Sequence, residues 1–424
     1  MKLNQIKNLT GLFFIFLGIS LNECILSNFF SYFAVAKLYS KLPVPALEIF
    51  FIILGVLLLV IKIDKDFIQK ARNFYKSFAL VLLNIISLFV FVCMLVSLIS
   101  FSKDFLSYKE QIFKQKNILH EIYPDLNNSQ IKKVLHETWS RGFSYEPYTQ
   151  FKESPYKGQF LNVSEHGFRH IKNQGPWPPL NSNFNIFIFG GSATFNYGLP
   201  DNQTIASCLQ ELLRKNKNKE NICVYNFARG FYYSTQERIL FQKLLSENQA
   251  PDLAVFIDGF NEFYFIKDEP LYTEELKYFL GGNLDKLLQG IFTTNKVQPK
   301  YDDPDILNQI TSRYLINKKL IEATADAFSV KTLFVWQPVP TYKYNLKYYK
   351  FANGDFGRFT YSRYGYEVMD KIKNKLGANF FWLADIQKDI NKPVYIDVDH
   401  YSSEMSRLIA KKINDYLISK NLVN

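Results

Sequence analysis

The sequence predicts an α/β protein in which a parallel sheet is covered by helices on both faces, preceded by an apolar region of transmembrane helices. Two observations predict this division. Long apolar runs are confined to the beginning of the 424-residue chain, and from Asn185 onwards short apolar runs alternate with amphipathic stretches. We therefore expect a membrane region at 1–105, a connector and loop-rich lead-in at 106–180, and a sheet domain at 181–424.

Three apolar segments predict transmembrane helices. The second segment is Ile49–Ile61 with its flanks and the third is Phe78–Phe101, and each reaches about the length that a bilayer requires. The first, Leu9–Phe33, carries Asn22 and Glu23 near its middle. These two polar residues have to face other helices or an interface, because exposing them to lipid would cost several kcal/mol.

The basic loop between the second and third segments predicts the orientation. Residues 62–76 include five lysines and arginines, which places this loop in the cytoplasm by the positive-inside rule. Everything after Phe101 is then expected on the periplasmic or extracellular side. A cleaved signal peptide is the alternative for the first segment, since Lys2 and Lys7 precede it and 34–36 reads Ala-Val-Ala. Both alternatives predict the same side for the rest of the chain.

Composition argues against several other classes of protein. The net charge is +11, but lysine and arginine are spread along the chain without a basic tract, so membrane orientation explains the excess better than nucleic acid does. The four cysteines form no C-x-x-C pair, which argues against a zinc ribbon or a disulfide framework. We expect them to be buried apolar residues: Cys24, Cys93, Cys208 and Cys223.

The rhythm of the sheet domain predicts its elements in order. Helical periodicity in the connector covers Ile118–Trp139. The rhythm breaks at about 263–305, which predicts an inserted cap beside the active site or, alternatively, a disordered loop. The expected strands are Ile186–Phe189, Ile222–Tyr225, Leu253–Ile257, Thr332–Trp336 and Phe380–Leu383, and the expected helices are Thr204–Leu213, Thr235–Leu245, Ile306–Phe328, Tyr364–Leu376 and Ser403–Ile418.

Reactive residue types follow the predicted strands, where ligands of parallel sheets bind. A Gly-Gly-Ser turn ending in Ser192 follows the first strand, the turn 226–234 follows the second, and Asp-Gly-Phe-Asn-Glu at 258–262 follows the third. Asp397-Val-Asp-His400 precedes the last helix. Together they supply a hydroxyl nucleophile, a histidine to take its proton, a carboxylate to orient the histidine, and amide donors for an oxyanion.

These four blocks resemble the SGNH/GDSL hydrolase family over roughly Asn185–Ser419. The resemblance implies a flavodoxin-like three-layer α/β/α domain that acts on ester bonds. It assigns the catalytic residues Ser192 as nucleophile, Asp397 as orienting carboxylate and His400 as base, and the oxyanion donors Ser192 and Gly230 through their backbone N–H groups and Asn261 through its side chain.

Two departures from the family pattern and one ambiguity accompany this assignment. Gly-Gly-Ser replaces Gly-Asp-Ser, and Glu262 replaces an Asp after Asn261, which leaves open whether Glu262 fixes its loop as an Asp would. Counting back from Ser234 puts the backbone oxyanion donor at Phe231 instead of Gly230. The lead-in motif 155–169 also looks like a segment that precedes this domain in some membrane-anchored bacterial members.

The resemblance and the reactive residues together imply a serine esterase or acyltransferase that acts on an O-acyl group. The apolar segments add a membrane anchor, and the location inferred from them favours an O-acyl, above all O-acetyl, group of an envelope glycan or lipid as substrate. We expect no cofactor, no metal and no nucleic-acid partner, and the oligomeric state stays open, as does the choice between hydrolase and transferase. One alternative is a non-catalytic, membrane-tethered glycan-binding or assembly protein on the same fold. Another is a metal site at Asp397, Asp399 and His400, which lacks a second histidine in a suitable motif.

Overall fold

The computed structural model divides the chain into two compact units, residues 1–109 and 110–424. Each unit is described by itself. The described residues are 3–22, 25, 44–60 and short stretches between 69 and 91 in the first unit, and 116–218, 220–281, 300–351 and 356–423 in the second.

The first unit contains two apolar helices that pack on each other. They are α1 (Leu3–Ser20) and α4 (Val44–Val60). Asn22, one of the polar residues in the first predicted span, donates a hydrogen bond to the Glu48 carboxylate (3.1 Å). Within the described part of the chain, no helix combines the length and the apolar character needed to cross a membrane. The segment Phe78–Phe101 lies largely outside the described residues, so the membrane spans stay predictions.

The second unit is built on the predicted parallel sheet, which is confirmed with five strands. Their order across the sheet is β6-β5-β7-β8-β9, and every neighbouring pair is parallel. The strands β5, β6 and β7 are apolar and almost wholly buried, as a parallel sheet covered on both faces requires. The strand bounds are β5 Phe184–Gly190, β6 Ile222–Asn226, β7 Leu253–Asp258, β8 Lys331–Trp336 and β9 Phe380–Trp382.

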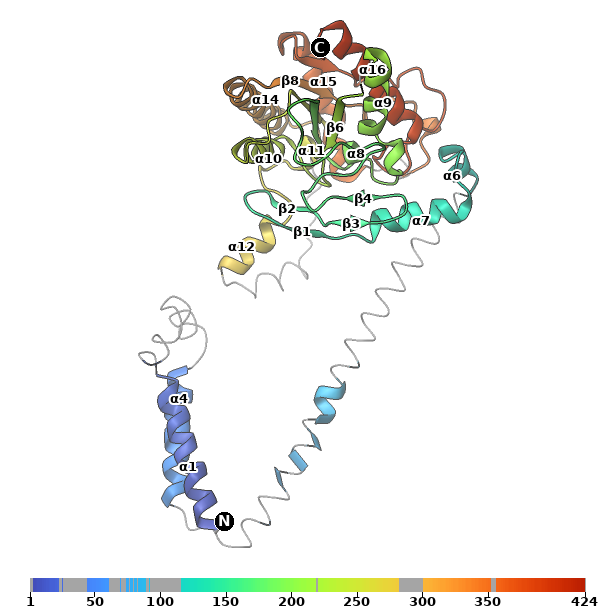
Figure 1. Cartoon of the computed structure of the whole chain (residues 1–424). Helices are drawn as coiled ribbons and strands as arrows, with labels where there is room; N and C mark the ends of the chain where they lie inside the picture. Colours follow the sequence, from blue (N-terminus) through green and yellow to red (C-terminus); the bar gives the residue numbers. More distant parts are fainter. Residues whose placement is uncertain are drawn as a thin grey trace. The chain divides into compact units, whose positions relative to one another are not determined.

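Helices cover both faces of this sheet and form two apolar cores. On one face α9 and α16 lie side by side, and on the other face α10 and α14 do (Figure 1). Most helices begin and end within a few residues of their predicted bounds, as helix ends generally do. The helix bounds are α9 Ile205–Lys217, α10 Ser234–Ser246, α14 Pro304–Ala327, α15 Thr360–Ile372 and α16 Ser403–Ser419, with the short α8 Ser192–Phe195 and α11 Phe260–Tyr264.

The lead-in packs on the sheet domain and shares its cores. Leu119 and Ile131 belong to the core beneath α9 and α16, and Phe151 belongs to the opposite core. The helical periodicity predicted over Ile118–Trp139 is confirmed as two helices, with Pro124 in the interval between them, where a helix does not continue. The lead-in elements are α6 Lys116–Ile122, α7 Asn128–Trp139, β1 Phe143–Glu146, β2 Gln150–Glu153, β3 Tyr156–Lys157 and β4 Asn162–Val163.

The predicted insertion is only partly described. It contains α12 (Thr273–Gly281), and residues 282–299 lie outside the described residues, so the choice between cap and loop stays open. Of the four cysteines, Cys208 and Cys223 are buried free thiols, as predicted. Cys24 and Cys93 fall outside the described residues.

Candidate active site

Ser192 begins a short helix directly after the first strand of the sheet along the chain. The strand ends at Gly190, and Gly191 is the N-cap of the helix. The Ser192 side chain is half-buried, and its backbone N–H donates no hydrogen bond within the described part of the chain. A Cβ atom at Gly191 would collide with the side-chain nitrogen of Asn261. Glycine is therefore required there so that the first and third blocks can approach each other.

The turn after β6 contacts the turn that holds Ser192. The N–H groups of the turn after β6 differ in their hydrogen-bond partners. The N–H of Arg229 donates to the carbonyl oxygen of Gly190 (3.0 Å). The N–H of Gly230 donates to Oε1 of Glu153 (2.8 Å). Phe231 has a left-handed backbone with φ +60°, and its N–H has no partner among the described residues. Phe231, and not Gly230, thus retains an N–H that a ligand could use.

The third block is fixed by two of its polar side chains, Asn261 and Glu262. The amide nitrogen of Asn261 donates one hydrogen bond to the carbonyl oxygen of Tyr232 (2.7 Å), which leaves its second hydrogen unused there. Oε1 of Glu262 accepts the N–H of Ser234 (2.6 Å), and its other oxygen is 3.4 Å from Arg313. Glu262 therefore holds its loop to the start of α10, a point that the sequence left open.

The loop before α16 arranges a histidine and two aspartates. Nδ1 of His400 is 2.7 Å and 2.8 Å from the two carboxylate oxygens of Asp397, and 3.2 Å from Oδ1 of Asp399. Oδ1 of Asp397 also accepts the backbone N–H groups of His400 (2.9 Å) and Asp399 (3.1 Å). Nε2 of His400 is buried and has no hydrogen-bond partner within the described residues. The ring is thus held through Nδ1, whereas Nε2 is buried without a hydrogen bond to the described residues.

Electrostatics favour the imidazolium form of His400. Burial lowers the pKa of His400, but the charges of Asp397 and Asp399 and the hydrogen bond with Asp397 outweigh burial and raise that pKa from 6.5 to about 9. Burial raises the pKa of Asp399 to about 6. Burial also acts to raise the pKa of Asp397, yet His400 and the N–H donors lower it below 3.8. Asp397 is the firmly ionised partner of the pair.

Two aromatic side chains that the sequence analysis missed surround the His400 ring. Tyr197 stacks on it with ring centroids 5.3 Å apart and an interplanar angle of 18°. Trp139 meets it edge-on at 5.6 Å and remains 49% exposed. Tyr197 follows Ser192 by a few residues, so its nearness could have been suspected. Trp139 comes from α7 in the lead-in, where no local pattern links it to a histidine so far along the chain.

The first three blocks contact one another in the second unit, and the fourth block contacts the segment that follows Ser192 through Tyr197. Gly191 approaches Asn261 and Tyr232, and Tyr197 links the first block to His400. No hydrogen bond joins Ser192 to His400 among the described residues. Catalytic hydrogen bonds are often long in the absence of substrate and shorten when the substrate binds.

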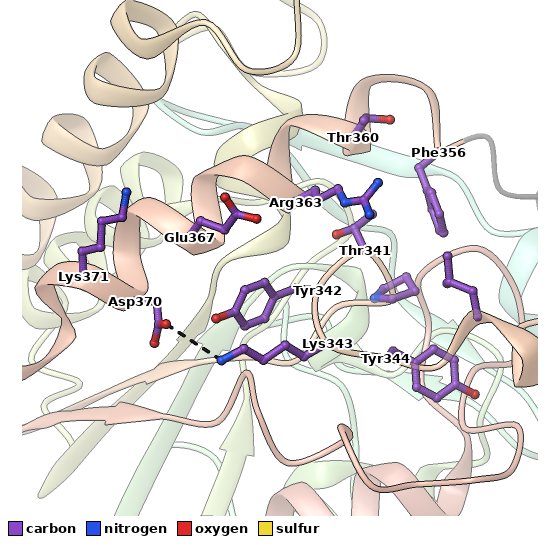
Figure 2. Close-up of a pocket in the computed structure, with 12 residues that line it drawn as sticks. Thr341, Tyr342, Lys343, Tyr344, Phe356, Thr360, Arg363, Glu367, Asp370 and Lys371 are labelled. Atoms are coloured by element: carbon purple, nitrogen blue, oxygen red, sulfur yellow. Dashed lines mark ion pairs between the residues drawn. The ribbon is translucent and has the colours of Figure 1, made fainter.

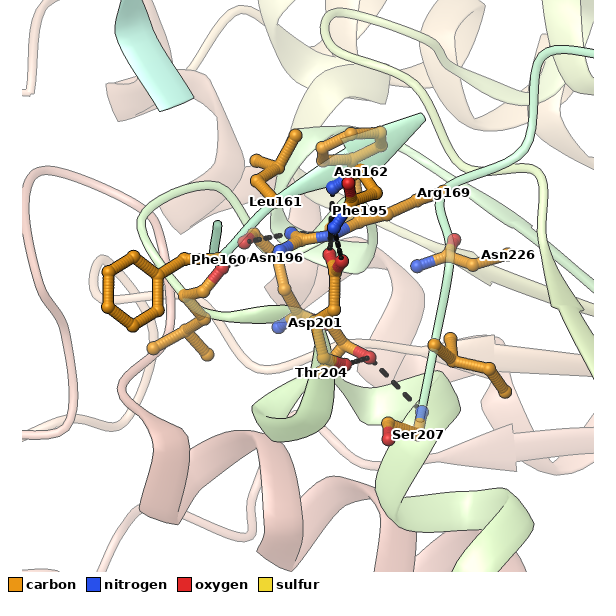
Figure 3. Close-up of polar contacts among 12 residues, drawn as sticks. Phe160, Leu161, Asn162, Arg169, Phe195, Asn196, Asp201, Thr204, Ser207 and Asn226 are labelled. Atoms are coloured by element: carbon orange, nitrogen blue, oxygen red, sulfur yellow. Dashed lines mark hydrogen bonds and ion pairs between the residues drawn. The ribbon is translucent and has the colours of Figure 1, made fainter. Parts of the chain in front are cut away.

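Arg169 of the lead-in clamps the segment that follows Ser192. Its guanidinium is fully buried and donates to the carbonyl oxygens of Phe195 (2.7 Å), Asn196 (2.6 Å) and Leu199, while Nε contacts the Asp201 carboxylate (3.0 Å). Figure 3 shows this arginine at the centre of the group. The lead-in motif that ends at Arg169 thus fixes the backbone on which Ser192 is carried.

The alternative metal site corresponds to a group of neighbouring donors. One ligand atom from each of Asp397, Asp399 and His400 lies within 4.8 Å of the others. Their proximity is also that of an ion pair between an imidazolium and two carboxylates. The group includes no second histidine and no cysteine, the residue types that most favour zinc.

A separate cavity of about 540 Å³ lies between the loop after β8 and α15. Figure 2 shows Arg363, Glu367 and Asp370 along the helix, facing the loop that carries Lys343. Lys343 pairs with Asp370 at 3.8 Å. None of the predicted catalytic residues lines this cavity.

Comparison with known proteins yields solved structures only. No family model and no curated protein matches the chain. A lipolytic protein of the G-D-S-L family from Desulfitobacterium hafniense is 14% identical, covering 55% of this chain and 100% of its own, with a TM-score of 0.33. The acetyl xylan esterase AlAXEase is 13% identical, covering 54% and 97%, with a TM-score of 0.33. The lipase Lip_vut3 from a goat rumen metagenome is 12% identical, covering 55% and 97%, with a TM-score of 0.36.

Proposed function

We propose that this chain is a serine hydrolase or acyltransferase of the SGNH type that acts on an O-acyl group. The observation that carries the proposal is the state of the His400 ring. Nδ1 is held by Asp397, whereas Nε2 is buried without a partner among the described residues. A buried nitrogen without a hydrogen bond costs free energy, and a general base needs such a nitrogen for the proton that it accepts.

The proposed reaction uses the groups around Ser192 in two steps. Nε2 of His400 takes the proton of Ser192 as Oγ attacks the ester carbonyl, and Asp397 stabilises the imidazolium. The imidazolium then gives this proton to the leaving alcohol, which leaves an acyl-enzyme. Water or an acceptor hydroxyl attacks the acyl group while His400 takes its proton, and Ser192 regains a proton when the product leaves.

The oxyanion is held by two backbone donors and one side chain. The N–H groups of Ser192 and Phe231 have no partner in the described chain, and Asn261 retains one amide hydrogen. Gly230 is not used, because Glu153 already accepts its N–H. This choice favours the register counted back from Ser234. Fixed donors of this kind stabilise the charge that develops in the transition state.

The substrate and location follow from the sequence and belong to the same proposal. The apolar segments before residue 105 anchor the chain in the membrane, and the basic loop 62–76 directs the catalytic domain to the periplasmic or extracellular side. An ester on that side belongs to an envelope glycan or lipid, and we propose an O-acetylated one.

The test is covalent labelling of the full chain by a serine-directed fluorophosphonate, followed by release of acetate from isolated envelope fractions. We expect wild-type protein and Ser182→Ala to be labelled, and Ser192→Ala to be unlabelled and inactive. Ser182 is an exposed serine outside the site, so it is a matched control. Absence of labelling in wild-type protein would favour the non-catalytic glycan-binding alternative.

A further inference from the structure

Glu153 belongs to the lead-in, and its buried carboxylate contacts residues of the candidate active site. It is the last residue of β2, and its side chain is 1% exposed. Oε2 pairs with the Arg141 guanidinium at 2.7 Å, and Arg141 is itself 2% exposed. Burying an ion pair costs several kcal/mol in desolvation unless further hydrogen bonds satisfy both groups. The remaining partners of Glu153 are therefore informative.

The other oxygen of Glu153 joins two of the four blocks. Oε1 accepts the hydroxyl hydrogen of Tyr197 (2.6 Å) and the N–H of Gly230 (2.8 Å). A Cβ atom at Gly230 would collide with the Tyr197 hydroxyl, so glycine is needed for this approach. One atom thus ties the turn after β6 to the segment that follows Ser192.

The hydrogen bond between Glu153 and Gly230 affects the neighbouring oxyanion donor, Phe231. Phe231 follows Gly230 directly and has φ +60°, a conformation that costs a residue with a side chain about 1–2 kcal/mol. Such strain persists only where neighbouring contacts enforce it. By holding the N–H of Gly230, Glu153 fixes the Arg229–Gly230 peptide. That peptide is adjacent to the one that carries the Phe231 N–H, so its position restricts the direction of this N–H.

The hydrogen bond between Glu153 and Tyr197 affects the proposed base, His400. The Tyr197 ring lies nearly parallel to the His400 ring, and its hydroxyl is fixed by Glu153. Burial and the charge of Glu153 raise the pKa of Tyr197 well above 10, so the phenol stays a hydrogen-bond donor over the range of an assay. The plane on which His400 rests is therefore set by the same carboxylate.

We infer that Glu153 is a positioning residue that fixes the turn 226–234 relative to His400. The lead-in would then contribute to catalysis as well as to folding. The inference rests on the proposed function for its kinetic consequence. Glu153 does not contact the reacting atoms, and it acts through Gly230 and Tyr197. Its loss should lower turnover with little change in KM, because misplaced groups lose contacts made in the transition state.

The test compares Glu153→Gln, Tyr197→Phe and the control Glu211→Gln in the full chain. Glu211 is an exposed carboxylate on α9. We expect Glu153→Gln to slow both fluorophosphonate labelling and kcat for p-nitrophenyl acetate by about 10²-fold, with KM within a factor of about three. Tyr197→Phe removes one of the two ties and should lose about tenfold. Because both changes act through one oxygen, their effects should be less than additive in the double variant.

Hydrogen exchange gives a readout that does not depend on activity. Peptides over 226–233 should exchange several-fold faster in Glu153→Gln than in wild-type protein, whereas peptides from α9 and α16 should be unchanged. Equal exchange over 226–233, or labelling within a factor of two of wild type, would overturn the inference. If wild-type protein itself is not labelled, the proposed function fails, and the exchange comparison still decides whether Glu153 holds the turn. Tyr197→Phe serves if Glu153→Gln does not fold.

Discussion

Glu153 and Glu237 are both buried carboxylates of the same domain, and their surroundings are opposite. Glu153 accepts hydrogen bonds from Arg141, Tyr197 and Gly230. Neither carboxylate oxygen of Glu237 has a donor within the described residues. Burial and the neighbouring Asp258 instead raise the pKa of Glu237 well above 4.5. A buried charge is retained where donors converge on it, as in the candidate site, and is neutralised by a proton where they do not.

The loop before α16 also contains one carboxylate with several donors and one with few, and the largest effect on turnover is expected there. Asp397 receives Nδ1 of His400 and two backbone N–H groups, whereas Asp399 lies only near Nδ1. We expect Asp397→Asn to lower kcat on the order of 10⁴-fold, because the wrong tautomer of His400 is then favoured. Asp399→Asn should cost less than about tenfold. Equal losses in folded protein would show that the two carboxylates share the orienting role.

The second prediction concerns the buried ion pair between Arg141 and Glu153. Arg141→Met leaves Glu153 buried without its cation, which should lower the free energy of unfolding by about 3–5 kcal/mol. The control is Lys411→Met, which breaks an exposed pair with Asp415 and should cost less than about 1 kcal/mol. Urea unfolding of both variants measures the difference. A similar small loss in both would mean that Glu153 does not depend on Arg141.

Much of the fold could be predicted because its signals are local. Alternating apolar runs mark the strands, and each reactive residue follows directly on a strand or precedes a helix, as Ser192 and His400 do. The contacts of Glu153 and Trp139 could not be predicted, since they arise when the lead-in folds over the sheet domain. For the same reason the sequence could not decide between Gly230 and Phe231: the N–H of Gly230 is occupied by a side chain from elsewhere in the chain.

The third prediction uses the pH dependence that the two aspartates create. His400 must be neutral to act as base, and its pKa is raised to about 9, so kcat/KM should rise with pH until about 9. Removing the charge of Asp399 stabilises the imidazolium less, so Asp399→Asn should move the midpoint to lower pH. A pH profile of p-nitrophenyl acetate hydrolysis measures both midpoints. A midpoint that stays in place would show that Asp399 does not act on the base.

At Glu237, the carboxylate without donors, we expect a gain in stability instead of a loss. A folded pKa above the unfolded value means that its favourable contribution is present below about pH 4.5 and is lost as pH rises through the folded pKa. Glu237→Gln cannot ionise and should remove this loss, so the variant should gain stability relative to wild type as the pH is raised from about 5 to about 8. Over the pH range in which wild-type Glu237 is ionised in the unfolded chain but protonated in the folded one, the free energy of unfolding of the variant should rise relative to wild type. The rise should be roughly 1.4 kcal/mol per pH unit. Urea unfolding at the two pH values measures this difference. A variant less stable than wild type by the same amount at both values would show that Glu237 is not protonated in the folded protein over this pH range.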